Sequence, residues 1–344
     1  MDAPTHCPNC GETLEPNAHF CEACGHELAG PAVARIVTSA HPATACSSCG
    51  GTAFTDQADG STYCDNCGVR LAAGLPSAEA DLGLIAVSSD IGKRHHNNED
   101  AFGIARVIGA LAGVVCDGVS SSSRPDTASH AAADAAIRTL LRILDGAPEH
   151  QPDGGIAEAA TVAAVGAAQA AAAAAGPAGS ENSESRRSAS NPPSTTFVSA
   201  VVTGDAVTVG WVGDSRAYWL GDNGESACLT IDDTLGGQLA AAGVKISEDA
   251  PNAAALIRWL GSDAVDTSPH IAAFQPTGPG RVIVCSDGLY RYAAAADELA
   301  AATPAGKPIE VVRTLVNFAL DAGGGDNVTV IVLPYPPIDE GQLP

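Results

Sequence analysis

The sequence predicts an α+β fold in which two antiparallel sheets pack together with helices outside, preceded by two small zinc ribbons. Three observations support this prediction. Strand-like apolar runs alternate with alanine-rich helical stretches from about residue 82 onward. Cysteines fall in regularly spaced pairs within the first 67 residues. With 344 residues, the chain is long enough for one domain of the size of an enzyme domain and a second, smaller part.

The cysteine pairs form two quartets with the spacing of structural zinc sites. The quartets are Cys7, Cys10, Cys21 and Cys24, and then Cys46, Cys49, Cys64 and Cys67. Each consists of two Cys-x2-Cys pairs, and a glycine follows every pair, as in zinc knuckles. Disulfides or a redox motif are the alternative, but residues 1–10 show no export signal, and a reducing cytosol disfavours disulfides. We therefore expect two structural Zn²⁺ ions.

The composition divides the chain into two ribbons, a catalytic domain and their connections. The expected parts are a first ribbon at 1–28, a linker at 29–43, a second ribbon at 44–72, a linker at 73–81, a catalytic domain at 82–336 and a tail at 337–344. Neither ribbon has enough apolar residues to fold alone, so metal binding should supply the folding free energy.

Apolar runs next to turn residues predict the strands, and alanine-rich amphipathic stretches predict the helices. The expected strands are 82–88, 101–107, 111–116, 195–203, 206–213, 215–220, 270–275, 281–285 and 327–333. The expected helices are 126–144, 155–175, 235–242, 252–259 and 308–321.

Charge and hydropathy exclude two classes of partner. The formal net charge is −23, with only 17 basic residues and no long basic run, which argues against nucleic acid. The longest weakly apolar stretch, 156–175, is mostly alanine and is interrupted by Glu158 and Gln169, so we expect a soluble helix and no membrane span. We expect a cytoplasmic protein.

Four short acidic motifs lie where apolar strands meet turns. They are Asn98-Glu99-Asp100, Asp117-Gly118, Ser286-Asp287-Gly288 and Gly325-Asp326-Asn327. Two of them open strands and two close strands, so an antiparallel sheet arrangement can bring all four to one edge. Clustered carboxylates repel one another unless a cation lies between them. Oxygen ligands suit Mg²⁺ and Mn²⁺, so the motifs predict a divalent metal site.

The ordered series of motifs resembles the metal-dependent protein phosphatases, the type 2C serine/threonine family, in its bacterial form. The matching fragments are Asp90-x-Gly92, Asn98-Glu99-Asp100-Ala101, Val115-Cys116-Asp117-Gly118, Ser194-Thr195-Thr196, Trp211 through Tyr218, Leu229-Thr230-x-Asp232-Asp233, Leu260-Gly261, Cys285 through Leu289 and Gly325 through Thr329. The match covers about residues 82–334. A single Asp-Gly is a common turn, and the order and spacing of the whole series carry the resemblance.

The resemblance implies an α-β-β-α four-layer sandwich with a site for two Mn²⁺ or Mg²⁺ ions at one end. Asp117 would bridge both ions, and Asp287 with Asp326 would hold one of them. Glu99 and the carbonyl of Gly118 would hold the other.

The resemblance also gives roles to three further residues. Asp100 would bind a metal ion through a metal-bound water or orient that water, and Asn327 would steady the adjacent turn. Asp214 is the candidate ligand of a third metal; the alternative is a turn aspartate that pairs with Arg216.

Three positions depart from the family pattern. His95 stands where relatives have an arginine that grips the substrate phosphate, and Arg94 precedes it. A histidine side chain is fully charged only at a pH below its pKa, which is ordinarily about 6.5. Either the affinity for phosphate therefore depends on pH, or Arg94 binds the phosphate instead. In the third alternative, His95 and His96 are both plain surface residues. Val119 and serines 120–123 replace a glycine pair. Arg291 stands where relatives that bind a third metal often carry an acid.

The predicted function is hydrolysis of phosphoserine and phosphothreonine in proteins through a binuclear Mn/Mg centre and metal-activated water. The substrates would be phosphoproteins made by a serine/threonine kinase. A pseudophosphatase that binds phosphoproteins without turnover is the alternative, prompted by His95 and the serine loop. A nucleic-acid adaptor is a third, weaker reading, because residues 1–74 carry eight acids against Arg35 and Arg70. We expect a protein partner at the ribbons.

Overall fold

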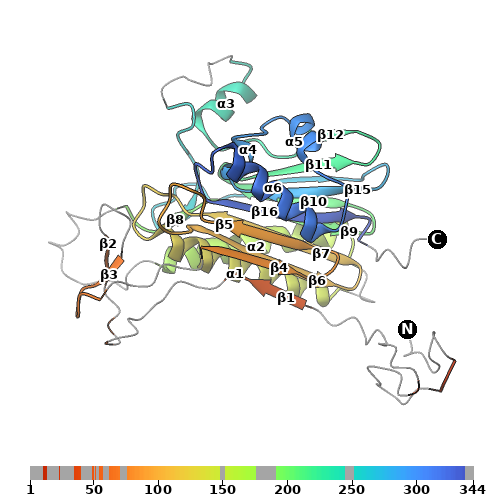
Figure 1. Ribbon diagram of the computed structural model, residues 1–344, viewed down its shortest axis with the longest axis horizontal. Coiled ribbons are helices and arrows are strands. Elements are labelled where there is room, and N and C mark those ends of the chain that lie inside the picture. The colour runs from red at the N-terminus through yellow and green to blue at the C-terminus, as the bar shows by residue number, and fades with distance from the viewer. Residues whose placement is uncertain are drawn as a thin grey trace.

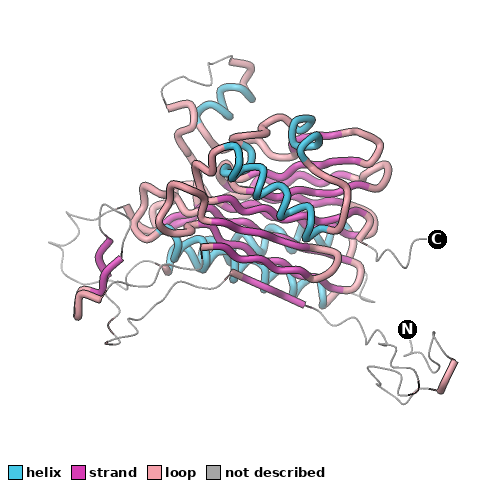
Figure 2. Tube along the Cα trace, viewed as in Figure 1, coloured by secondary structure: helices cyan, strands magenta, loops and turns pink. Residues whose placement is uncertain are grey.

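In a computed structural model, the chain folds into four layers, with helices on the outer faces of two packed antiparallel sheets (Figures 1 and 2). This arrangement confirms the predicted α+β sandwich. The structure describes residues 11–13, 23, 35–39, 49, 51, 54–56, 62–69, 76–147, 152–175, 191–244 and 252–337.

The first sheet has six strands, and two long helices cover its outer face. Its strands, in spatial order, are β1 (Arg35–Thr38), β6 (Asp100–Val107), β7 (Ala110–Asp117), β9 (Phe197–Thr203), β10 (Val207–Val212) and β14 (His270–Phe274). The covering helices are α1 (Pro125–Asp145) and α2 (Gly154–Ala174). Alanines on both helices pack closely against each other and against the sheet, which explains why alanine supplies so much of the core.

The second sheet also has six strands, and shorter helices cover its outer face. Its strands, in spatial order, are β12 (Ser226–Cys228), β11 (Arg216–Gly221), β15 (Gly280–Cys285), β16 (Val328–Tyr335), β5 (Ala86–Asp90) and β4 (Ser77–Asp81). The helices are α4 (Asp287–Tyr290), α5 (Ala296–Ala302) and α6 (Pro308–Ala322). The strands of both sheets alternate side chains between the central layer and the helical layers, so three apolar clusters hold the sandwich together.

Smaller elements lie at the ends of the sandwich. They are the strand pair β8 (Ser194–Thr195) and β13 (Leu260–Gly261), the strand pair β2 (Phe54–Asp56) and β3 (Thr62–Cys64), and helix α3 (Leu235–Ala241). Thr234 caps α3, because its hydroxyl oxygen accepts a hydrogen bond from the amide of Gly237.

Several elements differ from the sequence-based prediction. The helix expected at 252–259 is absent: residues 252–254 form a turn, and backbone groups of Ala253, Ala255 and Ile257 form hydrogen bonds with residues 233–236 around the start of α3. The expected linkers 29–43 and 73–81 contain the edge strands β1 and β4. Each of these strands pairs with a neighbour on one side only, and such edge strands are often short and weakly apolar. Their sequences therefore resemble those of linkers. The prediction also missed β12, α4 and α5.

Among the described residues, α2 is the one helix long and apolar enough to meet the length and composition of a membrane span. One face of this helix is buried against α1 and the first sheet: Ala157, Ala160, Ala164, Val165, Ala168 and Ala172. In the structure the segment thus packs into the core of the sandwich by this face.

Candidate metal centre

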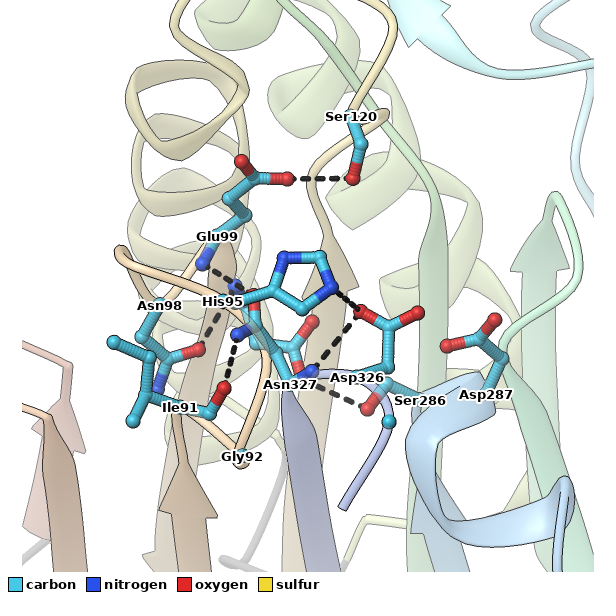
Figure 3. Close-up of polar contacts among 12 residues, drawn as sticks. Ile91, Gly92, His95, Asn98, Glu99, Ser120, Ser286, Asp287, Asp326 and Asn327 are labelled. Carbon is cyan, nitrogen blue, oxygen red and sulfur yellow. Dashed lines mark hydrogen bonds and ion pairs between the residues drawn. The ribbon is translucent and has the colours of Figure 1, made fainter. Parts of the chain in front are cut away.

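The topology brings the four acidic motifs to one end of the sandwich. Asp100 opens β6 and lies directly opposite Asp117, which closes β7. Asp287 begins α4 just after β15, and Asp326 precedes β16, which pairs with β15. Both sheets therefore contribute carboxylates to the same edge, as the alternation of strand starts and ends predicted (Figure 3).

Two glycines permit the close backbone contacts of this edge. Gly92 has a φ of +76°, and a Cβ there would lie 2.2 Å from the carbonyl oxygen of Asp326. A Cβ on Gly288 would lie 1.9 Å from the carbonyl oxygen of Asn327. Neither position accepts a side chain without moving the loop that carries Asp326.

The side chain of Asn327 ties three loop segments together. Its Oδ1 accepts a hydrogen bond from the amide of Glu99 at 2.8 Å. Its Nδ2 donates to the carbonyls of Ile91 at 2.8 Å and Asn97 at 3.1 Å (Figure 3). This network fixes Glu99 relative to Asp326, which is consistent with the predicted steadying role.

Asp100 is buried, with only one of its carboxylate oxygens satisfied. Its Oδ2 accepts hydrogen bonds from the hydroxyls of Ser286 at 2.8 Å and Thr329 at 2.7 Å. Its Oδ1 is buried with no hydrogen-bond partner among the described residues. Burial, opposed by the two hydroxyls, raises the pKa of Asp100 to about 7.

Asp117 is held through its backbone. Its amide donates to the hydroxyl of Thr196 at 3.0 Å, and the hydroxyl of Thr195 donates to its carbonyl at 2.9 Å. Burial and the neighbouring carboxylates, first among them Asp100, raise the pKa of Asp117 well above its ordinary value. Within the described residues, no ion pair reaches Asp100 or Asp117.

Asp287 and Asp326, by contrast, have basic side chains as partners. The Nη2 of Arg291 lies 2.5 Å from Oδ2 of Asp287 and 3.1 Å from Oδ2 of Asp326. The Nε2 of His95 lies 3.0 Å from Oδ1 of Asp326 (Figure 3). Burial raises the pKa of Asp287, and Arg291 opposes that rise. His95 and Arg291 thus face the carboxylates, whereas Arg94 is exposed to solvent.

Glu99 has a partner that the sequence reasoning did not anticipate. The hydroxyl of Ser120 donates to its Oε2 at 2.7 Å (Figure 3). Burial raises the pKa of Glu99, and this hydrogen bond opposes the rise. The first serine of the loop that replaces the family glycines therefore contacts a predicted metal ligand.

Asp214 lies on the second-sheet side of the site. Burial, followed by the nearby charge of Asp287, raises its pKa to about 7. Arg216 forms a bidentate pair with Asp232, at 2.9 and 2.8 Å, and its guanidinium stacks on the ring of Tyr290. Asp214 lies in the turn between β10 and β11, but Arg216 forms its ion pair with Asp232 rather than with Asp214, and the third-metal role stays a prediction.

Sequence reasoning missed the residues that support the carboxylates. Ser286, Thr329 and Thr196 all stand inside the quoted motifs, but no pattern indicated that their hydroxyls hold acids. Tyr292 lies outside those motifs, and its hydroxyl accepts a hydrogen bond from the amide of Gly325 at 2.9 Å. No signal in the sequence pointed to that contact.

Part of the second predicted zinc site lies in the described residues. The sulfurs of Cys49, Cys64 and Cys67 lie within 4.8 Å of one another, as a shared metal ion requires. The amides of Asn66 and Gly51 donate to the Cys49 sulfur and lower the pKa of this thiol to about 6. The other five predicted ligands lie outside the described residues: Cys7, Cys10, Cys21, Cys24 and Cys46.

The donor set fits hard divalent cations. The side chains predicted as ligands are all carboxylates, and the buried, unpartnered Oδ1 of Asp100 and the raised pKa of Asp117 indicate that negative charge is poorly compensated there. A bound dication would compensate it. Gly118 lies next to Glu99, because the amide of Gly118 donates a hydrogen bond to the carbonyl of Glu99 at 3.2 Å. The carbonyl of Gly118, a predicted ligand, is therefore close to that glutamate.

Comparison with known proteins gives matches for both parts of the chain. Residues 91–316, more than half of the chain, match the family model of protein phosphatase 2C, and residues 7–68 match that of the double zinc ribbon. The serine/threonine protein phosphatase PstP of Mycobacterium tuberculosis is 32% identical over 152 residues, covering 43% of this chain and 29% of that protein.

Two further matches agree with these. The serine/threonine phosphatase stp of Listeria welshimeri is 31% identical over 147 residues, covering 42% of this chain and 57% of that protein. The solved catalytic domain of PstP, in complex with two manganese ions, has a TM-score of 0.51 and 28% identity and covers 74% of this chain and 97% of that one. The chain thus spans less than two thirds of the length of the curated relatives it matches.

Proposed function

Because the chain belongs to the protein phosphatase 2C family and carries a double zinc ribbon, we propose that it is a metal-dependent hydrolase of phosphoserine and phosphothreonine in proteins. One observation carries this proposal. Five carboxylates converge at one end of the sandwich: Glu99, Asp100, Asp117, Asp287 and Asp326. The proteins it resembles are named as phosphatases, and one of them was solved with two manganese ions.

The proposed site holds two Mn²⁺ or Mg²⁺ ions. Asp117 would contact both ions, Asp287 and Asp326 would hold one, and Glu99 with the Gly118 carbonyl would hold the other. When bound, two such ions neutralise charge on phosphate oxygens and make a water molecule more acidic. Asp214 is the candidate for a third ion, because its raised pKa marks a carboxyl without adequate compensation.

The residues of the chain have distinct supporting roles in this proposal. Asp100, held by Ser286 and Thr329, is placed to accept a proton or hydrogen bond through its free Oδ1. Asn327 keeps Glu99 in place. His95 and Arg291 contact Asp326 and Asp287 and are the basic side chains that an incoming phosphate would meet at these carboxylates.

The proposal also covers the substrates, the location, the zinc ions and the partner of the protein. The substrates are phosphoproteins made by a serine/threonine kinase, and the protein acts in signalling in the cytoplasm. Each ribbon holds one structural Zn²⁺, and a protein partner binds at the ribbons. The charge of −23 supports a partner other than nucleic acid.

A phosphoprotein-binding role without turnover is the second candidate. The observation that favours it is the placement of Arg291, whose guanidinium pairs with both Asp287 and Asp326. In that role, the guanidinium would stay between the carboxylates and exclude one of the two ions.

Hydrolysis of p-nitrophenyl phosphate and of a phosphothreonine peptide, each with Mn²⁺, with Mg²⁺ and after chelation, tests the proposal. Metal-dependent turnover that Asp287→Asn removes, with an unchanged circular dichroism spectrum, supports the enzyme. Peptide binding without turnover supports the binding role. Turnover that survives chelation or Asp287→Asn contradicts the site.

A further inference from the structure

The backbone of Glu99 has a fixed place at the catalytic end. Its amide donates a hydrogen bond to Oδ1 of Asn327 at 2.8 Å. Its carbonyl accepts hydrogen bonds from the hydroxyl of Ser129 at 2.6 Å and from the amide of Gly118 at 3.2 Å. Because both backbone groups are satisfied by α1, by the end of β7 and by the start of β16, only the side-chain torsions of Glu99 remain to be fixed.

One hydrogen bond orients the carboxylate at the end of this side chain. The hydroxyl of Ser120 donates to Oε2 of Glu99 at 2.7 Å, and Figure 3 shows the carboxylate extended toward that hydroxyl. Within the part of the chain that the structure describes, no other hydrogen bond reaches this carboxylate. The distance is typical of a hydrogen bond to a charged oxygen, which is stronger than one between neutral groups. The orientation of Glu99 therefore depends on Ser120.

Electrostatic repulsion acts against this orientation in the metal-free protein. Burial raises the pKa of Glu99 most, and the charges of Asp126 and Asp326 add to the rise. The hydrogen bond from Ser120 is the largest effect in the opposite direction, ahead of that of His95. Repulsion from the two aspartates favours rotation of the carboxylate toward solvent, and the hydrogen bond from Ser120 opposes that rotation.

Ser120 stands in a turn that is attached to a neighbouring strand. The amide of Ser122 donates to the carbonyl of Val119 at 2.7 Å, which closes a turn with Ser120 and Ser121 at its centre. The amide of Val119 donates to the carbonyl of Ser194 at 2.9 Å, and the amide of Ser194 donates to the hydroxyl of Ser122 at 3.2 Å. The turn is thus fixed to β8, so that the backbone of Ser120 has a set position relative to Glu99.

The side chain at position 120 distinguishes this chain from the family pattern. Serines 120–123 belong to the stretch that stands where relatives have a glycine pair. Glycine has no side-chain donor, so a glycine at position 120 could not form the hydrogen bond to Glu99. Ser120 is exposed, and packing in the core therefore does not account for the serine.

We propose that Ser120 is a positioning residue of the metal centre, whose hydroxyl holds the Glu99 carboxylate ready to bind its ion. The proposal rests on the proposed function, in which Glu99 and the Gly118 carbonyl hold one of two ions. Ser120 acts through Glu99 alone: it restricts the rotamers of this ligand before the ion arrives, and so lowers the entropy lost on binding. The ion at Asp287 and Asp326 does not depend on it.

Isothermal titration calorimetry with Mn²⁺ tests the proposal. Ser120→Ala should weaken one of the two binding steps about tenfold, the lower end of what loss of a group that orients a metal ligand costs. The other step, at the carboxylates that Arg291 faces, should change little. Ser121→Ala, at the neighbouring exposed position of the same turn, is the matched control and should bind as the intact chain does. Ser120→Thr keeps a hydroxyl and should restore the affinity.

Two further measurements separate positioning from damage to the fold. Crystals of chelated Ser120→Ala should show the Glu99 carboxylate in another rotamer, with the contacts of its backbone to Asn327 and Gly118 retained. Hydrolysis of p-nitrophenyl phosphate by this variant should fall at limiting Mn²⁺ and recover when Mn²⁺ is in excess. Unchanged Mn²⁺ affinity, equal weakening of both steps, or equal weakening by Ser121→Ala would overturn the proposal.

Failure of the phosphatase function would give a different result. If the intact chain binds Mn²⁺ but hydrolyses neither p-nitrophenyl phosphate nor a phosphothreonine peptide, the proposed function fails. The calorimetric comparison of Ser120→Ala with Ser121→Ala would then still decide whether Ser120 positions Glu99.

Discussion

The two pairs of carboxylates at the catalytic end are compensated in different ways. Asp100 and Asp117 face each other across neighbouring strands with no ion pair among the described residues. Asp287 and Asp326 share Arg291, and His95 contacts Asp326 as well. The protein thus supplies its own cations to one pair, whereas the other pair depends on protons or on a bound metal ion.

Because of this difference, the unfavourable free energy of keeping the carboxylates ionised falls mainly on Asp100 and Asp117. Buried carboxylates at short range cannot both stay ionised without a cation, and the raised pKa values of Asp100 and Asp117 express that cost. Keeping Asp287 and Asp326 ionised requires less free energy, but a metal ion that binds there must compete with the Arg291 guanidinium. The predictions below separate these two effects.

The largest expected effect comes from Asp117→Asn. If Asp117 contacts both ions as proposed, its loss should lower kcat with Mn²⁺ by more than the 10- to 100-fold that loss of a supporting residue typically costs. The same change should raise the Tm of the chelated protein, because it removes a buried charge. Differential scanning calorimetry in chelator and a p-nitrophenyl phosphate assay measure both. Glu158→Gln, at an exposed position on α2, is the control and should alter neither. Lower Tm together with retained activity would contradict the account.

Asn327→Ala should weaken Mn²⁺ binding by about 10- to 100-fold, because Glu99 loses the hydrogen bond that positions it. Isothermal titration calorimetry gives the affinity directly. Asn223→Ala, which removes a turn hydrogen bond to Glu225, is the matched control. Equal affinities for the wild type and Asn327→Ala would show that Asn327 does not organise the site.

Arg291→Gln should tighten the weaker of the two Mn²⁺ sites by about three- to tenfold, since the ion no longer displaces a half-exposed ion pair. The stronger site should not change. Arg138→Gln removes an exposed pair with Asp134 elsewhere and serves as the control. Weaker binding in Arg291→Gln would mean that the guanidinium assists the ion rather than competing with it.

The smallest effect concerns the stability of the chelated protein as a function of pH. Asp100 and Asp214 have folded-state pKa values of about 7, above the value of about 4 for an unfolded aspartate. Between these values the folded state binds more protons, so the free energy of unfolding should fall as pH rises from about 4 to about 7. Urea titrations with chelator across that range measure the slope, and saturating Mn²⁺ should offset the loss at neutral pH. A free energy of unfolding that rises over this range would refute the assignment of these pKa shifts.

The sequence predicted the sandwich and the convergence of the acids because both follow from periodic patterns. Apolar alternation located most strands of both sheets, and the position of each acid at a strand start or end placed it at one edge. The edge strands β1 and β4 were not predicted, because four or five weakly apolar residues are too few to show a clear alternation of apolar and polar side chains. The segment 252–259 looked helical by composition but uses its backbone groups to pair with the start of α3.

The partners of the acids could not be predicted from the sequence. Whether Arg291 faces phosphate, solvent or Asp287 depends on a side-chain conformation that no spacing determines. The hydroxyl of Ser120 reaches Glu99 only because two loops meet in the fold. Such contacts depend on tertiary structure, so the roles of His95, Arg94 and Arg291 stayed open in the sequence.

The most direct test of this account is the anomalous scattering of crystals grown with Mn²⁺. The account predicts two manganese peaks, both within bonding distance of the Asp117 carboxylate, with the Arg291 guanidinium moved away from Asp287 and Asp326. A single peak remote from Asp117, or an Arg291 that still bridges the two carboxylates beside a fully loaded site, would contradict it.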